Sequence, residues 1–274
     1  MPTEASTSQT LTVQGVEIPK LGLGTWQLAG AACERAVADA LELGYRHIDT
    51  ARMYGNETEV GRAIAASGVG RDEIFLTTKL LPSALSAGGV RRQLDGSLSE
   101  LRLEYVDLLL IHWPSTDGTP LAETLGAMRE LQHQGAVRQL GVSNFPRAMA
   151  LEALALAPII CDQVEYHPYL GQPELLQLAR ERDLMLTAYS PLAQGAVLRD
   201  RLIRRIGKTH GKTPAQVVLR WLLHQPQVAA IPKASSSEHL AANLDVFDFQ
   251  LSDDERAAIS GLQRGGRTID PGWD

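Results

Sequence analysis

The chain has 274 residues, of which 44% are hydrophobic and 21% are charged, and its formal net charge is −6 at pH 7. This composition argues against a disordered chain, and the acidic balance argues against a nucleic-acid-binding protein, which typically carries a basic surface. No apolar run approaches the ~20 residues of a membrane span, no secretory signal is evident, and Cys33 and Cys161 form neither a disulfide framework nor a CxxC site, so we expect a cytoplasmic protein with buried thiols.

Eight short apolar runs predict strands, with amphipathic stretches between them. A hairpin is expected first, over residues 12–18 with Gly15 at its centre, where it could plug the N-terminal end of a barrel. The expected strands then span residues 20–23, 45–49, 74–79, 106–112, 137–142, 159–164, 184–188 and 228–231. Strands that alternate with helices favour a parallel α/β sheet, and eight is the number that closes a (β/α)8 TIM barrel.

Helix signals lie between these strands. One apolar face is formed by Cys33, Val37, Ala40 and Leu41, and another by residues 121, 125, 128 and 131. Capping-box spacing predicts helix starts at residues 213–216, 235–238 and 252–255. Residues 264–274 are Gly-rich and predict a C-terminal loop over the barrel mouth. No linker divides the chain, so we interpret residues 1–274 as one domain, with residues 1–10 as a flexible N-terminal segment.

Polar side chains stand at the ends of three successive expected strands. Asp49 ends YRHID, Lys79 ends IFLTTK, His112 ends VDLLLIH, and Tyr54 follows in the loop ARMYGNE. In such a barrel these ends meet at one mouth, where catalytic groups gather. A charged residue that ends an apolar strand is costly unless it is paired.

These four residues allow two interpretations. In the first, Asp49 and Lys79 form only a structural ion pair at the rim. In the second, the mouth reduces a carbonyl: Tyr54 protonates the oxygen, Lys79 lowers the pKa of Tyr54 and is held by Asp49, and a neutral His112 orients the substrate.

Seven motifs along the chain carry a family resemblance: GYRHIDTARMYGNE, TTKL, LLLIHWP, GVSNF, QVEYHP, AYSPLAQG and IPKASS. In this order they resemble the aldo-keto reductase superfamily. HGKTPAQVVLRW and NLDVFDFQLS resemble its bacterial branch that includes 2,5-diketo-D-gluconate reductases. The resemblance implies a barrel that is usually a monomer, reduces aldehydes and ketones with NADPH, and uses Asp49, Tyr54, Lys79 and His112 as its catalytic tetrad.

The resemblance also implies a cofactor site. In GLGTW the small residues would admit the nicotinamide beside Thr25 and Trp26, and Asp49 would share this end of the site. The family pattern places Ser143, Asn144 and Gln163 on the carboxamide and Tyr189 on the ring. It places the pyrophosphate along Ser190, Leu192, Gln194 and Gly195.

The loop after the last expected strand is typical of a phosphate site. Ile231 and Lys233 end the strand, and Ser235 and Ser236 precede a helix whose free amides can bind an anion. The chain departs from its relatives here, because His239 stands where many carry Arg and Ala242 where many carry Glu, whereas Asn243 is retained. Imidazole cannot hold a 2′-phosphate bidentately, so we expect a weakened NADPH preference and leave NADH open as a second cofactor.

The substrate pocket is expected to hold Tyr54 and His112 among Trp26, Met53, Trp113 and Trp273, and to take a small carbonyl compound. Two alternatives to a reductase stay open. A metal-dependent barrel hydrolase would recruit His47, Asp49, His112 and His167, but would leave Tyr54 and Lys79 unexplained. A non-catalytic nucleotide-sensing barrel would not need the tetrad. We predict no metal, and we expect His47 and His167 to be structural.

Overall fold

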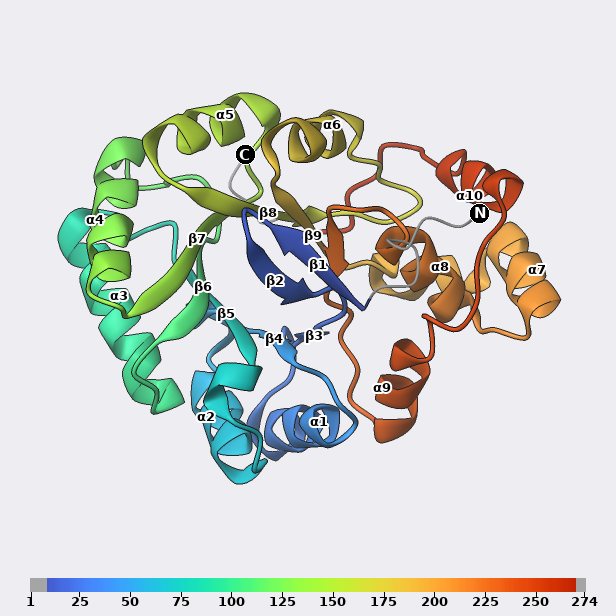
Figure 1. Ribbon diagram of the computed structural model, residues 1–274, viewed down its shortest axis with the longest axis horizontal. Coiled ribbons are helices and arrows are strands. Elements are labelled where there is room, and N and C mark those ends of the chain that lie inside the picture. Colours follow the sequence, from blue (N-terminus) through green and yellow to red (C-terminus); the bar gives the residue numbers. More distant parts are fainter. Residues whose placement is uncertain (1–8, 270–274) are drawn as a thin grey trace.

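The centre of the computed structural model, which describes residues 9–269, is an eight-stranded parallel sheet (Figure 1). Neighbouring strands follow the chain order. They are β3 (Leu23–Gly24), β4 (His47–Asp49), β5 (Phe75–Leu80), β6 (Val106–Ile111), β7 (Val137–Ser143), β8 (Ile159–Glu165), β9 (Met185–Tyr189) and β10 (Val228–Ala230). Leu21 bridges Ala230 in parallel, and the Gly22 amide donates to the Ala230 carbonyl at 2.9 Å. The first and last strands therefore meet, and the sheet closes into the expected barrel.

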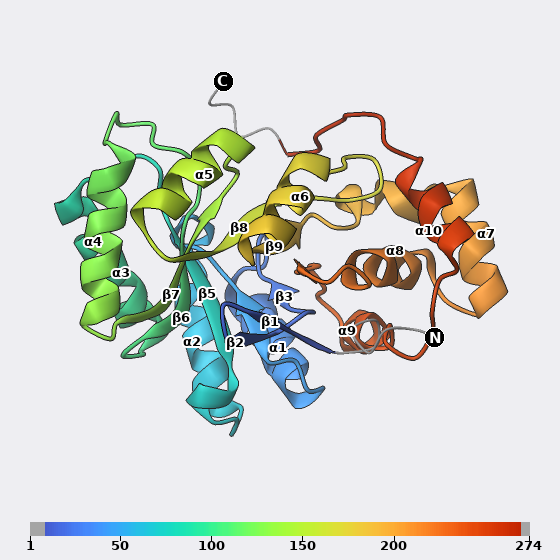
Figure 2. The ribbon, with the colours of Figure 1, turned by 45° about the horizontal axis from the view of Figure 1, so that its top comes forward.

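Helices surround this barrel, as Figures 1 and 2 show from two directions. They are α1 (Gly30–Glu42), α2 (Glu57–Ala66), α3 (Ala87–Leu101), α4 (Leu121–His133), α5 (Arg147–Leu156), α6 (Pro173–Arg182), α7 (Arg201–His210), α8 (Pro214–Leu223), α9 (Ser237–Leu244) and α10 (Asp253–Ser260). The short 3-10 helices are η2 (Arg52–Tyr54), η3 (Arg71–Glu73) and η4 (Ala193–Arg199). None of the helices described within residues 9–269 is both long and apolar enough to cross a membrane.

The hairpin β1 (Thr10–Val13) and β2 (Val16–Pro19) covers one end of the barrel. Its buried Leu11, Val13 and Ile18 belong to one cluster with residues early in the barrel strands, including Phe75 and Ile160. The hairpin therefore plugs the N-terminal end, as expected. The carboxyl ends of the strands are left to form the site.

The helix signals are confirmed except at one start. Cys33, Val37, Ala40 and Leu41 are buried on α1, and Thr213 and Ser252 form capping boxes on α8 and α10. The expected cap at Ser235 is wrong: Ser236 caps α9 by accepting from the His239 amide, so the helix starts one residue later.

Most observed strands differ from their expected bounds by one or two residues, and the larger differences lie near the N-terminus. The first barrel strand is Leu23–Gly24, because residues 20–22 are joined to Ala230 only by an isolated bridge and its flanking hydrogen bonds. Of the expected flexible segment, residues 1–8 lie outside the described part of the chain, and Thr10 already belongs to β1.

Candidate active site

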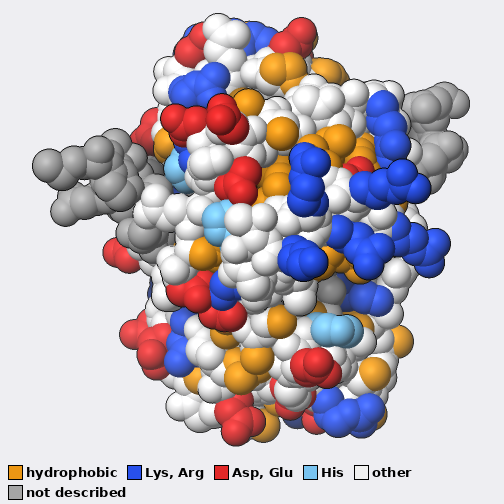
Figure 3. Space-filling view, turned by 90° about the vertical axis from the view of Figure 1, so that its right-hand side faces the viewer, with side chains coloured by type: hydrophobic (Ala, Val, Ile, Leu, Met, Phe, Trp, Pro, Cys, Tyr) orange, Lys and Arg blue, Asp and Glu red, His pale blue; other side chains and the backbone are white. Residues whose placement is uncertain are grey.

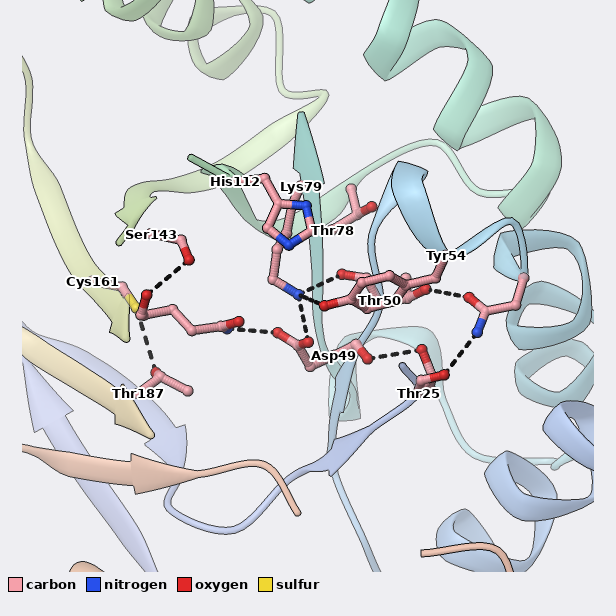
Figure 4. Close-up of polar contacts among 12 residues, drawn as sticks. Thr25, Asp49, Thr50, Tyr54, Thr78, Lys79, His112, Ser143, Cys161 and Thr187 are labelled. Atoms are coloured by element: carbon pink, nitrogen blue, oxygen red, sulfur yellow. Dashed lines mark hydrogen bonds and ion pairs between the residues drawn. The ribbon is translucent and has the colours of Figure 1, made fainter. Parts of the chain in front are cut away.

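The four polar residues singled out at the strand ends converge at one mouth of the barrel (Figure 4). Asp49 ends β4, Lys79 lies in β5, His112 follows β6, and Tyr54 ends η2. Lys79 Nζ lies 2.5 Å from Asp49 Oδ1 and 3.2 Å from the Tyr54 hydroxyl. The Tyr54 and His112 rings meet edge to face at 5.7 Å between centroids. The ammonium thus links the carboxylate to the phenol beside the imidazole.

The Lys79–Asp49 pair is removed from water, with side-chain exposures of 0% and 1%. Other bonds fix both partners: Lys79 Nζ donates to the Thr50 carbonyl at 2.9 Å, and Gln163 Nε2 donates to Asp49 Oδ2 at 2.7 Å. The Thr25 hydroxyl donates to the Asp49 carbonyl at 3.0 Å. A buried ion pair whose other donors and acceptors are also hydrogen-bonded is held in one geometry. This suits a site that must position a phenol.

The protonation states follow from burial and from the neighbouring charges. Burial opposes the charged form of Lys79, but Asp49 and Tyr54 more than offset it, so the pKa of Lys79 lies above its usual value. Burial raises the pKa of Tyr54, and Lys79 counteracts part of that rise. Burial, helped by the charge of Lys79, holds the pKa of His112 well below its usual value.

One sequence-based expectation is therefore wrong in direction. The pKa of Tyr54 was expected to fall, yet the loss of hydration outweighs the neighbouring ammonium. The phenol keeps its proton, which is the form that an acid must have before it donates. His112 is neutral, as expected.

A cavity of about 260 Å³ opens above these groups. Its wall includes Trp26, Met53 and Trp113 from the expected substrate set. It also includes Ile269 from the C-terminal segment, which sequence analysis did not single out. Trp273, the remaining member of that set, lies outside the described residues. Mainly apolar and aromatic walls around a polar floor are typical of small-molecule sites.

The residues expected to hold the carboxamide lie together across β7, β8 and β9. Asn144 Nδ2 donates to the Ser143 hydroxyl at 2.9 Å and to the His112 carbonyl at 3.1 Å. The Tyr189 hydroxyl donates to Asn144 Oδ1 at 2.8 Å, and Ser143 Oγ donates to the Gln163 carbonyl at 2.7 Å. Amide and hydroxyl groups thus stand beside an aromatic ring, as a nicotinamide requires.

The loop after β9 has an unusual backbone. Ser190, Ala193 and Gln194 have positive φ angles of 45°, 48° and 50°, and Gly195 has 89°. Left-handed conformations in non-glycine residues are uncommon and gather at ligand sites. Ser190 lines the cavity, and Leu192 packs partly buried against the core. The expected pyrophosphate loop is therefore a tight turn beside the cavity.

The expected phosphate end also comes together. Ile231 and Lys233 line the cavity, and Lys233 is exposed. Ser235 is exposed, Ser236 caps α9, and His239 is exposed in the first turn of that helix. Asn243 is buried, and its side chain lies close enough to Tyr45 to lower the pKa of that phenol against the larger effect of burial.

This donor set fits a dinucleotide. Amides and an aromatic ring stand at one end of the site, and a cation with a helix N-terminus stands at the other. The two glycines of GLGTW are also required by packing, whether or not a cofactor is bound. A Cβ on Gly24 would lie 2.6 Å from the Ile231 carbonyl, and one on Gly22 would lie 2.8 Å from the His47 ring. Close packing in and just before the first barrel strand thus requires both glycines.

Glu165 is the main residue that sequence analysis missed. It ends β8 fully buried and accepts from the Thr268 amide at 2.7 Å, from the Ile269 amide at 3.2 Å and from the Thr268 hydroxyl. Arg267 donates to Asn144 Oδ1 at 3.2 Å and lies over the Trp113 ring at 5.4 Å. The signal was available, because an acid at the end of an apolar strand is what singled out Asp49.

The histidines of the metal alternative have local partners. His47 Nδ1 lies 3.1 Å from the Pro19 carbonyl, and His167 Nε2 lies 3.0 Å from Glu165 Oε1. Both rings are buried, in agreement with structural roles. Within residues 9–269, His, Cys, Asp and Glu side chains form no group of three that could hold a metal ion.

Comparison with known proteins gives one consistent result. The model of the aldo/keto reductase family matches residues 20–264. An aldo-keto reductase of Mycolicibacterium smegmatis is 44% identical over 256 residues, 92% of each chain. A crystal structure provisionally assigned as 2,5-diketo-D-gluconic acid reductase B superposes with a TM-score of 0.94 at 44% identity, over 97% of this chain and 96% of that one. The aldose reductase from Schistosoma japonicum gives 0.92 at 33% identity, over 97% and 96%.

Proposed function

The chain belongs to the aldo/keto reductase family of NAD(P)H-dependent oxidoreductases, and from that premise we propose that it reduces the carbonyl of small aldehydes or ketones, with Tyr54 as the general acid. One observation carries this proposal: a single buried ammonium, Lys79, contacts both Asp49 and the Tyr54 hydroxyl beside a neutral His112. A purely structural ion pair would not need the phenol and the imidazole at the floor of a cavity.

The cofactor is NADPH in this proposal. Ser143, Asn144 and Gln163 would hold the carboxamide, with Tyr189 against the ring. The bound reduced nicotinamide supplies a hydride. The loop from Ser190 through Leu192, Gln194 and Gly195 would follow the pyrophosphate, and Thr25 and Trp26 would border the ribose.

The other phosphate belongs to the loop before α9. The residues that would surround it are Ile231, Lys233, Ser235, Ser236 and His239, and Asn243 lies one turn further along α9. Lys233 and the free amides still favour the 2′-phosphate, so NADPH is preferred over NADH. His239 offers no bidentate pair, so this preference is smaller than an Arg would give.

The protein's own groups handle the proton. The neutral His112 imidazole donates a hydrogen bond to the substrate oxygen and orients it. Tyr54 gives up its phenolic proton to that oxygen as negative charge develops there, and the Lys79 ammonium stabilises the phenolate that remains. Asp49 keeps Lys79 charged and in place.

The substrates are sugar-derived or other small carbonyl compounds. The open cavity, with Trp26, Met53 and Trp113 in its wall, suits compounds of this size, and a structurally similar protein carries a provisional assignment to 2,5-diketo-D-gluconic acid. From the sequence alone we further propose a monomeric, single-domain, cytoplasmic enzyme.

The test is NADPH oxidation by purified protein across aldehydes, sugar ketones and steroids, followed at the nicotinamide absorbance. Carbonyl-dependent oxidation of NADPH with alcohol as the product is expected. Tight NADPH binding with no turnover of any carbonyl would instead support the nucleotide-sensing alternative and contradict the proposal.

A further inference from the structure

An uncompensated group of cations lies where η4 meets α7. Arg199 ends η4, and the exposed face of α7 follows with residues spaced three and four apart. We call this group the basic stripe: Arg199, Arg201, Arg204, Arg205 and Lys208. All five side chains are exposed, and none forms an ion pair with another residue of the described chain, 9–269. The chain as a whole carries a net charge of −6.

The charges beyond the stripe are neutralised. At the far end of α7, His210 lies 2.9 Å from Glu255, and Lys212, just past the helix, lies 2.8 Å from Asp245 and 2.7 Å from Asp248. The unpaired positive charge of this region therefore runs from Arg199 at the end of η4 to Lys208 in the last turn of α7. Figure 3 views the molecule from the side on which α7 lies in Figure 1. Lys and Arg side chains gather on one half of that view, whereas acidic side chains are more frequent on the other half.

The cations of the basic stripe destabilise the helix that carries them. Asp200 caps α7 by accepting from the Leu202 and Ile203 amides. The first turn after this cap contains no acidic residue, and Arg201 stands there against the positive end of the helix dipole. Arg201 with Arg205, and Arg204 with Lys208, are like-charge pairs four residues apart, and such pairs destabilise a helix. Residues that oppose the charge preferences of a helix and gain no compensating contact are expected at functional positions.

The position of the stripe indicates its ligand. Helix α7 packs against η4, whose Gln194 and Gly195 belong to the proposed pyrophosphate loop. The cavity reaches Ser190 and Pro191 just before η4, and Lys233 on its other side. The stripe thus adjoins, through η4, the loop that is proposed to hold the pyrophosphate.

We propose that the basic stripe steers the anionic dinucleotide into its site. This inference rests on the proposed function, because it takes NADPH as the ligand. The pyrophosphate and the 2′-phosphate, itself about −1.5 to −2 at neutral pH, make the ligand strongly anionic. A local positive field at a cleft raises the association rate, and charges at a rim act on association and its salt dependence more than on dissociation.

A large polyanion fits the stripe less well. An extended nucleic acid or acidic protein would also approach the rest of the surface, which is acidic, because the whole chain has a net charge of −6 even with the cations of the stripe included. A dinucleotide is small enough to respond mainly to charges within a Debye length, about 8 Å at physiological ionic strength. Charge complementarity over a short range therefore favours the cofactor.

The experiment is stopped-flow NADPH binding, followed by tryptophan quenching, with the double variant Arg201→Gln/Arg205→Gln. Gln has a helix propensity close to that of Arg, so folding should be kept, and circular dichroism checks this. The matched control is Arg92→Gln/Arg129→Gln, which removes the same charge from exposed positions on α3 and α4, across the barrel from α7 in Figure 1. Both are compared with wild type at roughly 10 mM and 150 mM ionic strength, where the Debye length is about 30 Å and 8 Å.

We expect the stripe variant to lose about threefold to tenfold in association rate at the lower ionic strength, toward the lower end of electrostatic steering. The loss should shrink at the higher ionic strength, the dissociation rate should change less than about twofold, and the control should resemble wild type. Equal association rates in all three proteins would overturn the inference, as would a loss confined to dissociation or a loss of equal size in the control. If wild type binds no NADPH at all, the proposed cofactor itself is wrong and the steering role falls with it.

Discussion

The buried pair of Lys79 and Asp49 allows a quantitative test of whether the two residues act as a unit. In Lys79→Met the Asp49 carboxylate keeps Gln163 as a donor but loses its counter-charge, and in Asp49→Asn the ammonium keeps only neutral partners at Thr50 and Tyr54. Removing one partner from a buried pair costs about 3–5 kcal/mol, because the other charge is left uncompensated. Independent effects would therefore sum to about 6–10 kcal/mol.

The double variant should cost far less than that sum. It leaves no buried charge, and neutral groups in place of a buried ion pair are often close to neutral in stability. We expect an interaction free energy of at least about 3 kcal/mol, the upper end for residues in direct contact. Urea unfolding of the wild type, both single variants and the double variant measures it, provided that the m-values agree. Additivity within about 0.5 kcal/mol would refute the coupling and leave two independent residues.

Three further outcomes are expected. His239→Arg should tighten NADPH by about tenfold or more, equivalent to about 1.5–3 kcal/mol, and leave the Kd of NADH nearly unchanged; equal tightening of both cofactors would place His239 away from the 2′-phosphate. Burial raises the pKa of Asp162 well above its usual value, so the contribution of Asp162 to wild-type stability should fall as pH rises above about 4. Asp162→Asn should therefore have a higher Tm than wild type at pH ~8 and a similar Tm near pH ~4, and an unchanged difference across this range would contradict it. Glu165→Gln should speed amide exchange at Thr268 and Ile269 by about tenfold, because charge-assisted bonds of about 1.5–3 kcal/mol are weakened; unchanged exchange would show that other contacts hold the C-terminal segment.

The fold was predictable because its signals are periodic and local. Alternating strands and helices, the hairpin around Gly15 and the Thr213 cap are all encoded over a few neighbouring residues. The misplaced Ser235 cap shows the limit of such signals. Consecutive serines offer the same hydroxyl, and only the backbone path selects Ser236.

The site was predictable where a polar residue stands at the end of an otherwise apolar strand. Asp49, Lys79 and His112 were visible in this way, whereas Glu165 carried the same signal without an evident partner. Its partners, Thr268 and Ile269, follow more than 100 positions later in a segment with no periodicity. The direction of the Tyr54 pKa was missed for a related reason, because hydration depends on the packed structure and not on the neighbouring residues in sequence.

The most direct test of the central claim is Tyr54→Phe, which removes the proposed acid and keeps the ring against His112. Single-turnover NADPH oxidation with a reactive aldehyde, together with the Kd of NADPH, separates chemistry from binding. We expect the Kd to stay within about twofold and the rate to fall by about 10²–10⁴, the usual contribution of general acid catalysis. A folded Tyr54→Phe protein that reduces the aldehyde at a near-normal rate would contradict the assignment of Tyr54 as the proton donor.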